Sequence, residues 1–297
     1  TVALGLEDGS ATNSHLHMYV GTKTATGNAF EKAGLNNGKL YVLNVPTAAT
    51  DNVFRTAIGK NKSTPVTFKE VNWNQTVADF DKSVTAEGTE FARIEDGEFD
   101  PNNPNVFYFL TTESNKDLIA TAPNPATPTV TRDGGGLWRL TFKDAQNPLL
   151  GAELELLLNG GENIYMSKPD NMAITKNGVI MIQEDPGNNA ALARVVSYRI
   201  SDGKLATVAQ FKSEYFTTGA AAFITQDEES SGIIDVTKYL KSGSSDKAKY
   251  YMLVAQIHAT PAKSRPDLSP TPFGLENAVE GGQWYVMKVN NWTGIYS

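Results

Sequence analysis

The stretch that decides the fold is ARVVSYRISDGKLATVAQF, residues 193–211. Two runs rich in β-branched and aromatic residues flank the turn sequence Ser-Asp-Gly-Lys, and Asp-Gly in that setting is among the strongest short-range signals of a β-hairpin. Asn37-Gly38 and Asn177-Gly178 stand between other runs of the same kind. We therefore expect antiparallel strands joined by tight turns.

The same rhythm extends over the whole chain. Short runs of high β-propensity are bounded by Gly, Asn, Asp and Pro, and helical periodicity is confined to residues 76–87 and 234–241. We predict strands over residues 16–20, 39–45, 66–71, 106–111, 136–142, 153–158, 179–183, 193–200, 205–211, 250–257 and 283–289.

Many short strands with regular turns indicate an all-β fold, a β-propeller or a β-sandwich. The segments GLWRLTF, ARVVSYRI and QWYVMKVNN share a pattern resembling an inner blade strand, which favours the propeller, incomplete or closed with few blades, over the sandwich. We predict one propeller-like domain over residues 1–297. Residues 114–132 and 260–272 are predicted insertion loops, because the strand rhythm resumes on each side.

Composition excludes several function classes. The 297 residues carry 26 Lys+Arg against 33 Asp+Glu, which gives a net charge of −7 and argues against a nucleic-acid partner. No apolar run approaches the roughly 18 residues of a spanning helix, so we predict no membrane span. The cysteine count of 0 excludes disulfides, thiol nucleophiles and cysteine-type metal sites.

The chain begins at Thr1 without an apolar leader, so we expect a mature or trimmed polypeptide. Three sequons make Asn61, Asn74 and Asn291 candidates for glycosylation. These features fit a secreted protein, extracellular or periplasmic.

Four acidic or amide-rich loops lie at strand ends, over residues 92–105, 168–172, 183–189 and 225–232. Carboxylate and amide oxygens on converging loops are the ligands that Ca²⁺ prefers, and a propeller brings the loops of one face together. The alternative interpretation is a set of solvated loops with local Asx-turns. Apolar residues beside the loops favour partly buried carboxylates, which must be paired or metal-bound.

Basic side chains accompany two of these loops. Arg93 lies two positions before Glu95, and Arg194 follows the third loop. A guanidinium beside a metal cluster suits bidentate phosphate binding, and a structural salt bridge is the alternative. We interpret His258 as a core or rim residue. No nucleophile motif of the G-x-S-x-G type occurs.

An ordered series of motifs resembles the PhoX-type alkaline phosphatase family. The motifs are YVGTKTATGNAFEKAGLNNGKLYVL, EFARIEDGEFDPNNPNVFYFLTTES, GGGLWRLTF, PDNMAITKNGVIMIQEDPGN, LARVVSYRI and TQDEESSGIIDVT. The resemblance implies a secreted β-propeller that uses a calcium-containing cluster to hydrolyse phosphate esters. It implies Glu95, Glu184 and Glu229 as metal ligands with Asp185 and Glu228 as alternates, Asn171 and Arg93 as orienting residues, and Arg194 on the phosphate oxygens.

The chain also departs from that family. Members carry an N-terminal portion with an acidic/His motif and, in the iron-containing enzymes, a cysteine ligand, and we expect that portion to be missing. With no cysteine, we expect Ca²⁺ and not iron. Our first hypothesis is a calcium-dependent phosphoesterase acting on a small phosphate ester. The second is a non-catalytic extracellular propeller that binds calcium and self-assembles as a surface, matrix or filament subunit. The third is a propeller that hydrolyses sugars or lactones with one central Ca²⁺.

Overall fold

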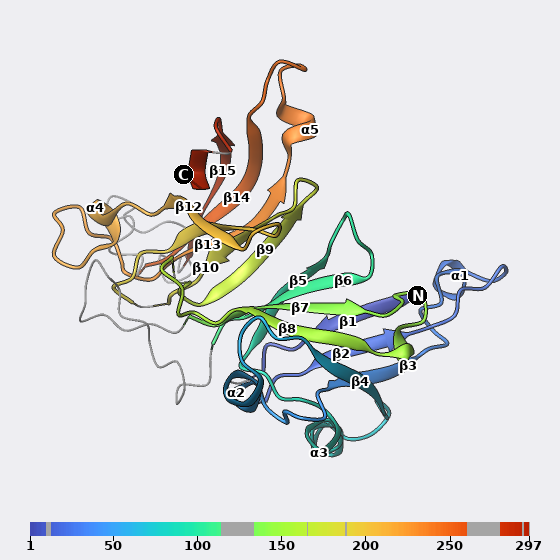
Figure 1. The fold of residues 1–297 in the computed structure, drawn as a ribbon. Coiled ribbons are helices and arrows are strands. Elements are labelled where there is room, and N and C mark those ends of the chain that lie inside the picture. The colour runs from blue at the N-terminus through green and yellow to red at the C-terminus, as the bar shows by residue number, and fades with distance from the viewer. Residues whose placement is uncertain are drawn as a thin grey trace, which may run out of the picture. The chain divides into compact units, whose positions relative to one another are not determined.

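The structure is a computed structural model that describes residues 1–9, 13–113, 134–164, 166–187, 189–259, 280–292 and 294–296 (Figure 1). The chain divides into two compact units, Thr1–Ala120 with Gly135–Gly161 and Thr121–Gly134 with Glu162–Ser297. The predicted insertion loops at 114–132 and 260–272 lie outside the described residues, and the single domain over 1–297 stays a prediction.

Unit 1 consists of two antiparallel four-stranded meanders. The first is β1 (Val2–Leu6), β2 (Leu16–Val20), β3 (Lys39–Asn44) and β4 (Thr64–Val71). The second is β5 (Ile94–Phe99), β6 (Val106–Thr111), β7 (Gly136–Phe142) and β8 (Ala152–Leu158). Because the fourth strands β4 and β8 pair, the meanders form one eight-stranded sheet whose edge strands, β1 and β5, contact each other.

The helices of unit 1 are short. The predicted helix at residues 76–87 is confirmed as α3 (Val77–Glu87), and its N-cap Thr76 accepts a hydrogen bond from the backbone of Asp79. The others are α1 (Ala29–Ala33), α2 (Asp51–Val53), the π-helical η1 (Phe54–Ile58) and the 3₁₀ turn η2 (Pro148–Leu150).

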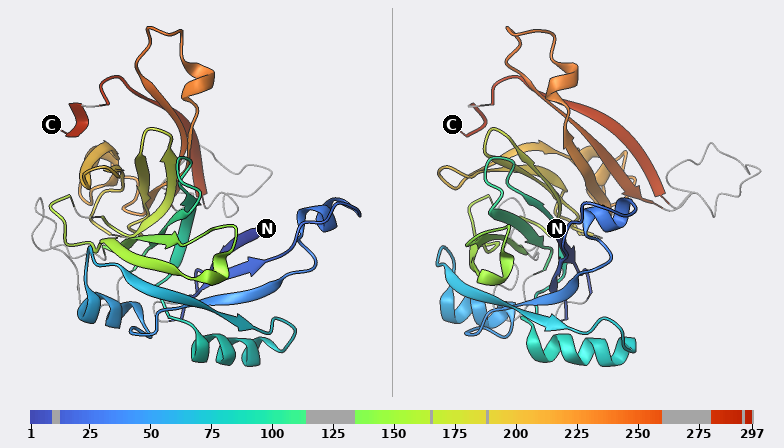
Figure 2. Two further views of the ribbon diagram at one scale, coloured as in Figure 1. Left: turned by 45° about the vertical axis from the view of Figure 1, so that its right-hand side comes forward. Right: turned by 90° about the vertical axis from the view of Figure 1, so that its right-hand side faces the viewer.

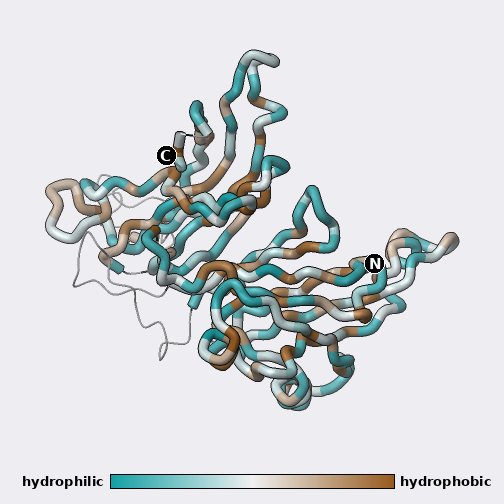
Figure 3. The backbone as a smooth tube through the Cα atoms, viewed as in Figure 1, coloured by the Kyte–Doolittle hydropathy of each residue, from teal (hydrophilic) through white to brown (hydrophobic). Residues whose placement is uncertain are grey.

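The core of unit 1 is built around Trp138. Its ring meets Phe54 and Phe91 edge-on at centroid distances of 5.0 and 5.3 Å and stacks on Phe109 at 6.0 Å. Figure 3 shows the corresponding pattern along the chain, short hydrophobic stretches interrupted by hydrophilic ones.

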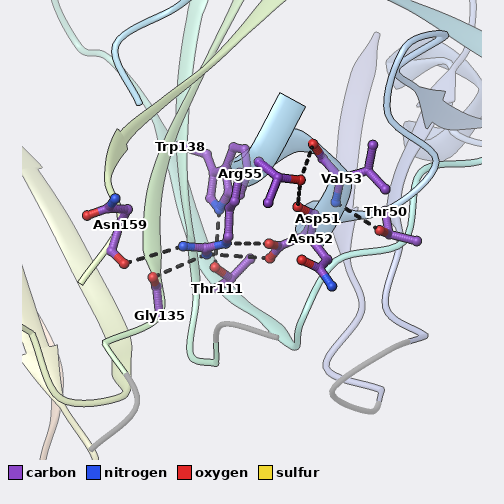
Figure 4. A network of polar contacts seen from close by, with 10 residues as sticks. Thr50, Asp51, Asn52, Val53, Arg55, Thr111, Gly135, Trp138 and Asn159 are labelled. Atoms are coloured by element: carbon purple, nitrogen blue, oxygen red, sulfur yellow. Dashed lines mark hydrogen bonds and ion pairs between the residues drawn. The ribbon is translucent and has the colours of Figure 1, made fainter. Parts of the chain in front are cut away.

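A buried polar network joins the helical segment formed by α2 and η1 to the ends of neighbouring strands in unit 1 (Figure 4). Arg55 and Asp51 form an ion pair whose side chains are 2% and 3% exposed, and Arg55 also donates to the carbonyls of Gly135 and Asn159. Trp138 Nε1 donates to Thr111 Oγ1 at 3.1 Å. The network therefore holds the end of β6, which leads directly into the candidate site of this unit.

Unit 2 consists of a third and a fourth meander. The third is β9 (Pro169–Thr175), β10 (Val179–Glu184), β11 (Arg194–Arg199) and β12 (Lys204–Gln210). Within the described residues the fourth has three strands, β13 (Glu228–Asp235), β14 (Lys249–His258) and β15 (Glu280–Val289), with β15 along the sheet edge (Figure 2). The helical turns among its described residues are α4 (Ser213–Phe216), α5 (Thr237–Leu240) and η4 (Gly294–Tyr296).

The turn signals were largely correct. Asn177-Gly178 joins β9 to β10 and Asp202-Gly203 joins β11 to β12, with both glycines at positive φ. Asn37-Gly38 is different, because α1 lies within that connection. The three segments with a shared pattern are β7, β11 and β15, each the third strand of its meander.

Candidate metal centre

Two of the predicted acidic residues, Glu95 and Glu184, lie on a hairpin that occurs in both units, and Asp185 directly follows it in unit 2. In β5–β6 the segment 94–97 opposes residues 109–111, and in β9–β10 the segment 169–172 opposes residues 182–184. Each first strand therefore carries one extra residue at the same place, a β-bulge that re-aims its side chains. The bulges contain Glu95 in unit 1 and Asp170 in unit 2.

A basic residue in the left-handed region precedes each bulged strand. Arg93 has φ +58° and Lys168 has φ +46°. Their carbonyls accept from the backbone N–H of Thr112 at 2.9 Å and of Asp185 at 3.0 Å. A non-glycine residue held in this conformation costs about 1–3 kcal/mol, so both hairpins hold a backbone that places the next acidic side chain.

In unit 2 three carboxylates converge. Asp170 on β9, Asp185 directly after β10 and Glu229 on β13 have ligand oxygens that all lie within 4.8 Å of one another. Opposite oxygens around a Ca²⁺ ion are about 5 Å apart, so the three oxygens fit one coordination sphere. We call Asp170, Asp185 and Glu229 the acidic triad. The donor set, hard carboxylate oxygens, is the one that Ca²⁺ prefers.

Glu228 adds an unsatisfied oxygen beside the triad. Its side chain is buried, Oε1 accepts from the backbone N–H of Ala193 at 3.0 Å, and no described residue gives Oε2 a hydrogen-bond partner. Burial raises the pKa of Glu228 to about 7, and the negative charges of Asp227 and Asp185 act in the same direction. A cation at this place would offset the excess of negative charge.

Glu184 and Arg194, both predicted site residues, form a bidentate pair. Arg194 donates to the two Glu184 oxygens from Nε at 2.8 Å and from Nη2 at 2.6 Å. The Glu184 side chain is 0% exposed and also accepts the backbone N–H of Ser167 at 2.7 Å. The neighbouring Asp185, and not Glu184, belongs to the triad.

Asn171 of β9 and His258 of β14 make hydrogen bonds or close polar contacts around the triad. Asn171 Oδ1 accepts from Ser231 Oγ and from the backbone N–H of Gly232, each at 2.8 Å, and so ties β9 to β13. His258 Nε2 lies 3.3 Å from Glu229 Oε2. The sequence interpretation of His258 as a core or rim residue missed this contact, and it passed over Asp170 in favour of Asn171.

In unit 1 a guanidinium lies among the carboxylates. Arg93 binds Asp8 through two hydrogen bonds of 2.8 and 3.1 Å, Glu95 at 3.0 Å and Glu113 at 3.7 Å. The hydrogen bonds to Asp8 contribute most to raising the pKa of Arg93 above its ordinary value. We call Arg93, Asp8, Glu95 and Glu113 the Arg93 cluster. Asp8 and Glu113 were missed because they lie far from Glu95 in the sequence.

Glu7, which precedes Asp8 in the sequence, makes close polar contacts with two histidines. Its carboxylate lies 3.1 Å from His15 Nδ1 and 3.4 Å from His17 Nε2. Burial alone would raise the pKa of Glu7, but the hydrogen bonds from the two histidines outweigh it and lower the pKa to about 2.

The three sequon asparagines, Asn61, Asn74 and Asn291, are all exposed. None of the helices in the described part of the chain has the length and apolar character needed to span a bilayer.

Known proteins place this arrangement in context. No curated protein sequence matches the chain. The fold matches that of Pseudomonas fluorescens PhoX in complex with vanadate, a transition-state analogue, with a TM-score of 0.54 and 15% identity over 100% of this chain. The chain spans 52% of that protein, about half its length. At this identity the likeness shows the fold, which is all-β and of the β-propeller type.

The sequence likeness is broader. The family model described as "Alkaline phosphatase PhoX" matches residues 2–237, most of the chain. The motifs that span both units, from the end of β2 to β13, all lie within that match. The chain therefore belongs to the PhoX alkaline phosphatase family.

Proposed function

We propose that the protein is a secreted, calcium-dependent phosphoesterase that hydrolyses small phosphate esters. The observation that carries this proposal is the convergence of Asp170, Asp185 and Glu229 within 4.8 Å in a member of the PhoX family. Three carboxylates this close, one of them buried, are costly without a cation. Ca²⁺ held there would supply a Lewis acid that offsets negative charge on a phosphoryl oxygen.

The surrounding residues have roles that follow from their contacts. Asn171 fixes the bulged strand of Asp170 to β13, and His258 orients the Glu229 carboxylate. Arg194 is assigned to phosphate oxygens, with Glu184 holding its guanidinium in one orientation by two hydrogen bonds. Glu184 and Glu228 are two further acidic residues, each next to a triad residue in the sequence.

Unit 1 has a related proposed role. The family resemblance implied Glu95 as a metal ligand oriented by Arg93. Because the two side chains are joined at 3.0 Å, we propose instead that the Arg93 guanidinium supplies the positive charge beside Glu95 in place of a metal ion. Glycosylation at the exposed Asn61, Asn74 and Asn291 would suit a secreted protein.

The test is turnover of a chromogenic phosphomonoester after removal of divalent ions with a chelator. We expect activity to disappear and to return with Ca²⁺. Asp185→Asn should lower calcium-dependent turnover by at least about 100-fold, because it removes a charged ligand. Asp235→Asn is the matched control, since Asp235 is exposed on β13 and its contact to the Thr237 backbone N–H survives in asparagine. Absence of calcium-restored turnover, or equal turnover in Asp185→Asn, would contradict the proposal.

A second candidate function is a non-catalytic, calcium-binding extracellular subunit that assembles with copies of itself. The exposed edge strand β15 favours it. Calcium that raises the melting temperature without any turnover would distinguish this function from the first.

A further inference from the structure

The acidic triad draws its residues from two separate sheets. Asp170 and Asp185 come from the third meander, whereas Glu229 comes from the fourth. Among the described strands, no pairing joins the sheet of β9 and β10 to the sheet of β13. Because a backbone ladder does not set the distance across the triad, side-chain contacts between the two sheets have to set it.

One such contact joins β10 to β13 directly beside the triad. Gln183 Nε2 donates a hydrogen bond to Ser230 Oγ, and both residues are buried, at 0% and 2% exposure. Gln183 lies two residues before Asp185, and Ser230 directly follows Glu229. The hydrogen bond therefore links the two chain segments at the place where each one supplies a carboxylate.

Gln183 is an unfavourable residue for the core that surrounds it. All six residues of β10 are buried, and Gln183 shares a strand face with Val179 and Met181, which belong to the hydrophobic core of unit 2. The Oε1 atom of Gln183 is buried, and the described part of the chain gives it no hydrogen-bond partner. A buried amide oxygen without a partner lowers stability, so an apolar side chain would suit the core better. A polar residue retained at such a cost is typical of a functional site.

We propose that Gln183 is a positioning residue for the acidic triad and that, through Ser230, it fixes the place of Asp185 relative to Glu229. Asn171 makes the equivalent link from β9, because its Oδ1 accepts two hydrogen bonds from β13. Each strand of the third meander that supplies a carboxylate is thus tied to β13 by one amide side chain. Carboxylates held in place before the ion arrives bind it more tightly, because less ordering remains for the binding step. This inference rests on the proposed calcium site.

The experiment is calorimetric titration of Ca²⁺ into the metal-stripped full chain. Ser230→Ala removes the hydrogen-bond acceptor, and Gln183→Met removes the amide at nearly constant volume. Each variant should bind Ca²⁺ about 10- to 100-fold more weakly than the wild type, as is usual when a residue that supports metal ligands is lost. The double variant should bind about as weakly as either single variant, because the two side chains act through one hydrogen bond.

Ser197→Ala is the matched control. Ser197 is a buried serine of unit 2, at 0% exposure, and its hydroxyl donates to the carbonyl of Ala206 at 3.3 Å, between β11 and β12. Ser197→Ala and Ser230→Ala should lower the melting temperature by similar amounts, but only Ser230→Ala should weaken calcium binding. Ser230→Thr keeps the hydroxyl and should restore part of the lost affinity, which a merely structural role would not predict.

The outcomes separate this inference from the calcium site itself. If the wild type binds Ca²⁺ and Gln183→Met binds it equally well, or if Ser197→Ala loses as much affinity as Ser230→Ala, the inference is overturned and the calcium site stands. Losses that add up in the double variant would show that Gln183 does not act through Ser230, and would also overturn it. A wild type that binds no Ca²⁺ would overturn the calcium site and the inference together.

Discussion

The β5–β6 hairpin of unit 1 and the β9–β10 hairpin of unit 2 have the same bulge and the same left-handed basic residue, yet their charges are arranged differently. In unit 1 Arg93 lies among three carboxylates. In unit 2 the carboxylates of the triad approach one another instead. Partly buried carboxylates at such distances must be compensated. The two hairpins therefore share one backbone geometry, a bulge preceded by a left-handed residue. In unit 1 the protein's own Arg93 compensates the carboxylates, and in unit 2, by our proposal, a bound Ca²⁺ ion does so.

The largest expected effect comes from removing the Arg194 guanidinium of unit 2. Arg194→Met leaves the fully buried Glu184 carboxylate without its bidentate partner. We expect the free energy of unfolding, measured by urea denaturation, to fall by about 3–5 kcal/mol. Lys39→Met, which breaks an exposed pair with Glu70, is the control and should leave the free energy of unfolding nearly unchanged, because solvent screens this pair.

The same experiment has a second variant. Because the cost of Arg194→Met arises from an unpaired buried charge, adding Glu184→Gln should restore part of the stability. A double variant as unstable as Arg194→Met alone would show that packing, and not charge, accounts for the loss.

The next largest effect is expected when the Arg93 cluster loses its guanidinium, which leaves carboxylates grouped together as in the acidic triad. Arg93→Met removes the internal cation from Asp8, Glu95 and Glu113 and should cost about 2 kcal/mol, less than a buried pair because Arg93 is 31% exposed. The variant should also gain a rise of melting temperature with added Ca²⁺ beyond that of the wild type. Arg93→Lys keeps the charge and should show no such gain. An equal calcium response in all three proteins would refute the idea that Arg93 takes the place of a metal ion.

The smallest effect concerns pH. Glu7 has a folded-state pKa of about 2, below the ordinary 4.5. Its contribution to stability is therefore fully present above about pH 4.5 and is lost as the pH falls toward 2. Because the Glu7 side chain is 36% exposed, we expect about 1 kcal/mol. Urea denaturation of Glu7→Gln and the wild type should give a difference that shrinks between pH 4.5 and 2, and a constant difference would contradict this.

The sequence predicted the strands unevenly, for a physical reason. The first strand of every meander was missed, namely residues 2–6, 94–99, 169–175 and 228–235. Three of these strands contain acidic residues, glycine, asparagine or serine where a strand usually has β-branched residues, as in IEDGEF and EESSGIID. Strand propensity describes how well a side chain packs on a sheet, and it fails where the residues are retained for a site.

The site was predicted in its chemistry and less well in its membership. Acidic loops pointed to Asp185 and Glu229, but Asp170 was passed over for its neighbour Asn171. The bulge over residues 169–172 and the left-handed Lys168 decide which of the two faces the triad, and neither feature has a sequence signature. Similarly, the pairing of Glu184 with Arg194 depends on the register of β10 with β11.

The acidic triad as a calcium site is the central claim, and calorimetric titration of Ca²⁺ into the metal-stripped protein tests it most directly. We expect the wild type and Asp235→Asn to bind with equal affinity, and Asp185→Asn to bind at least about tenfold more weakly. Equal binding by Asp185→Asn and the wild type, or no binding by the wild type, would contradict the claim.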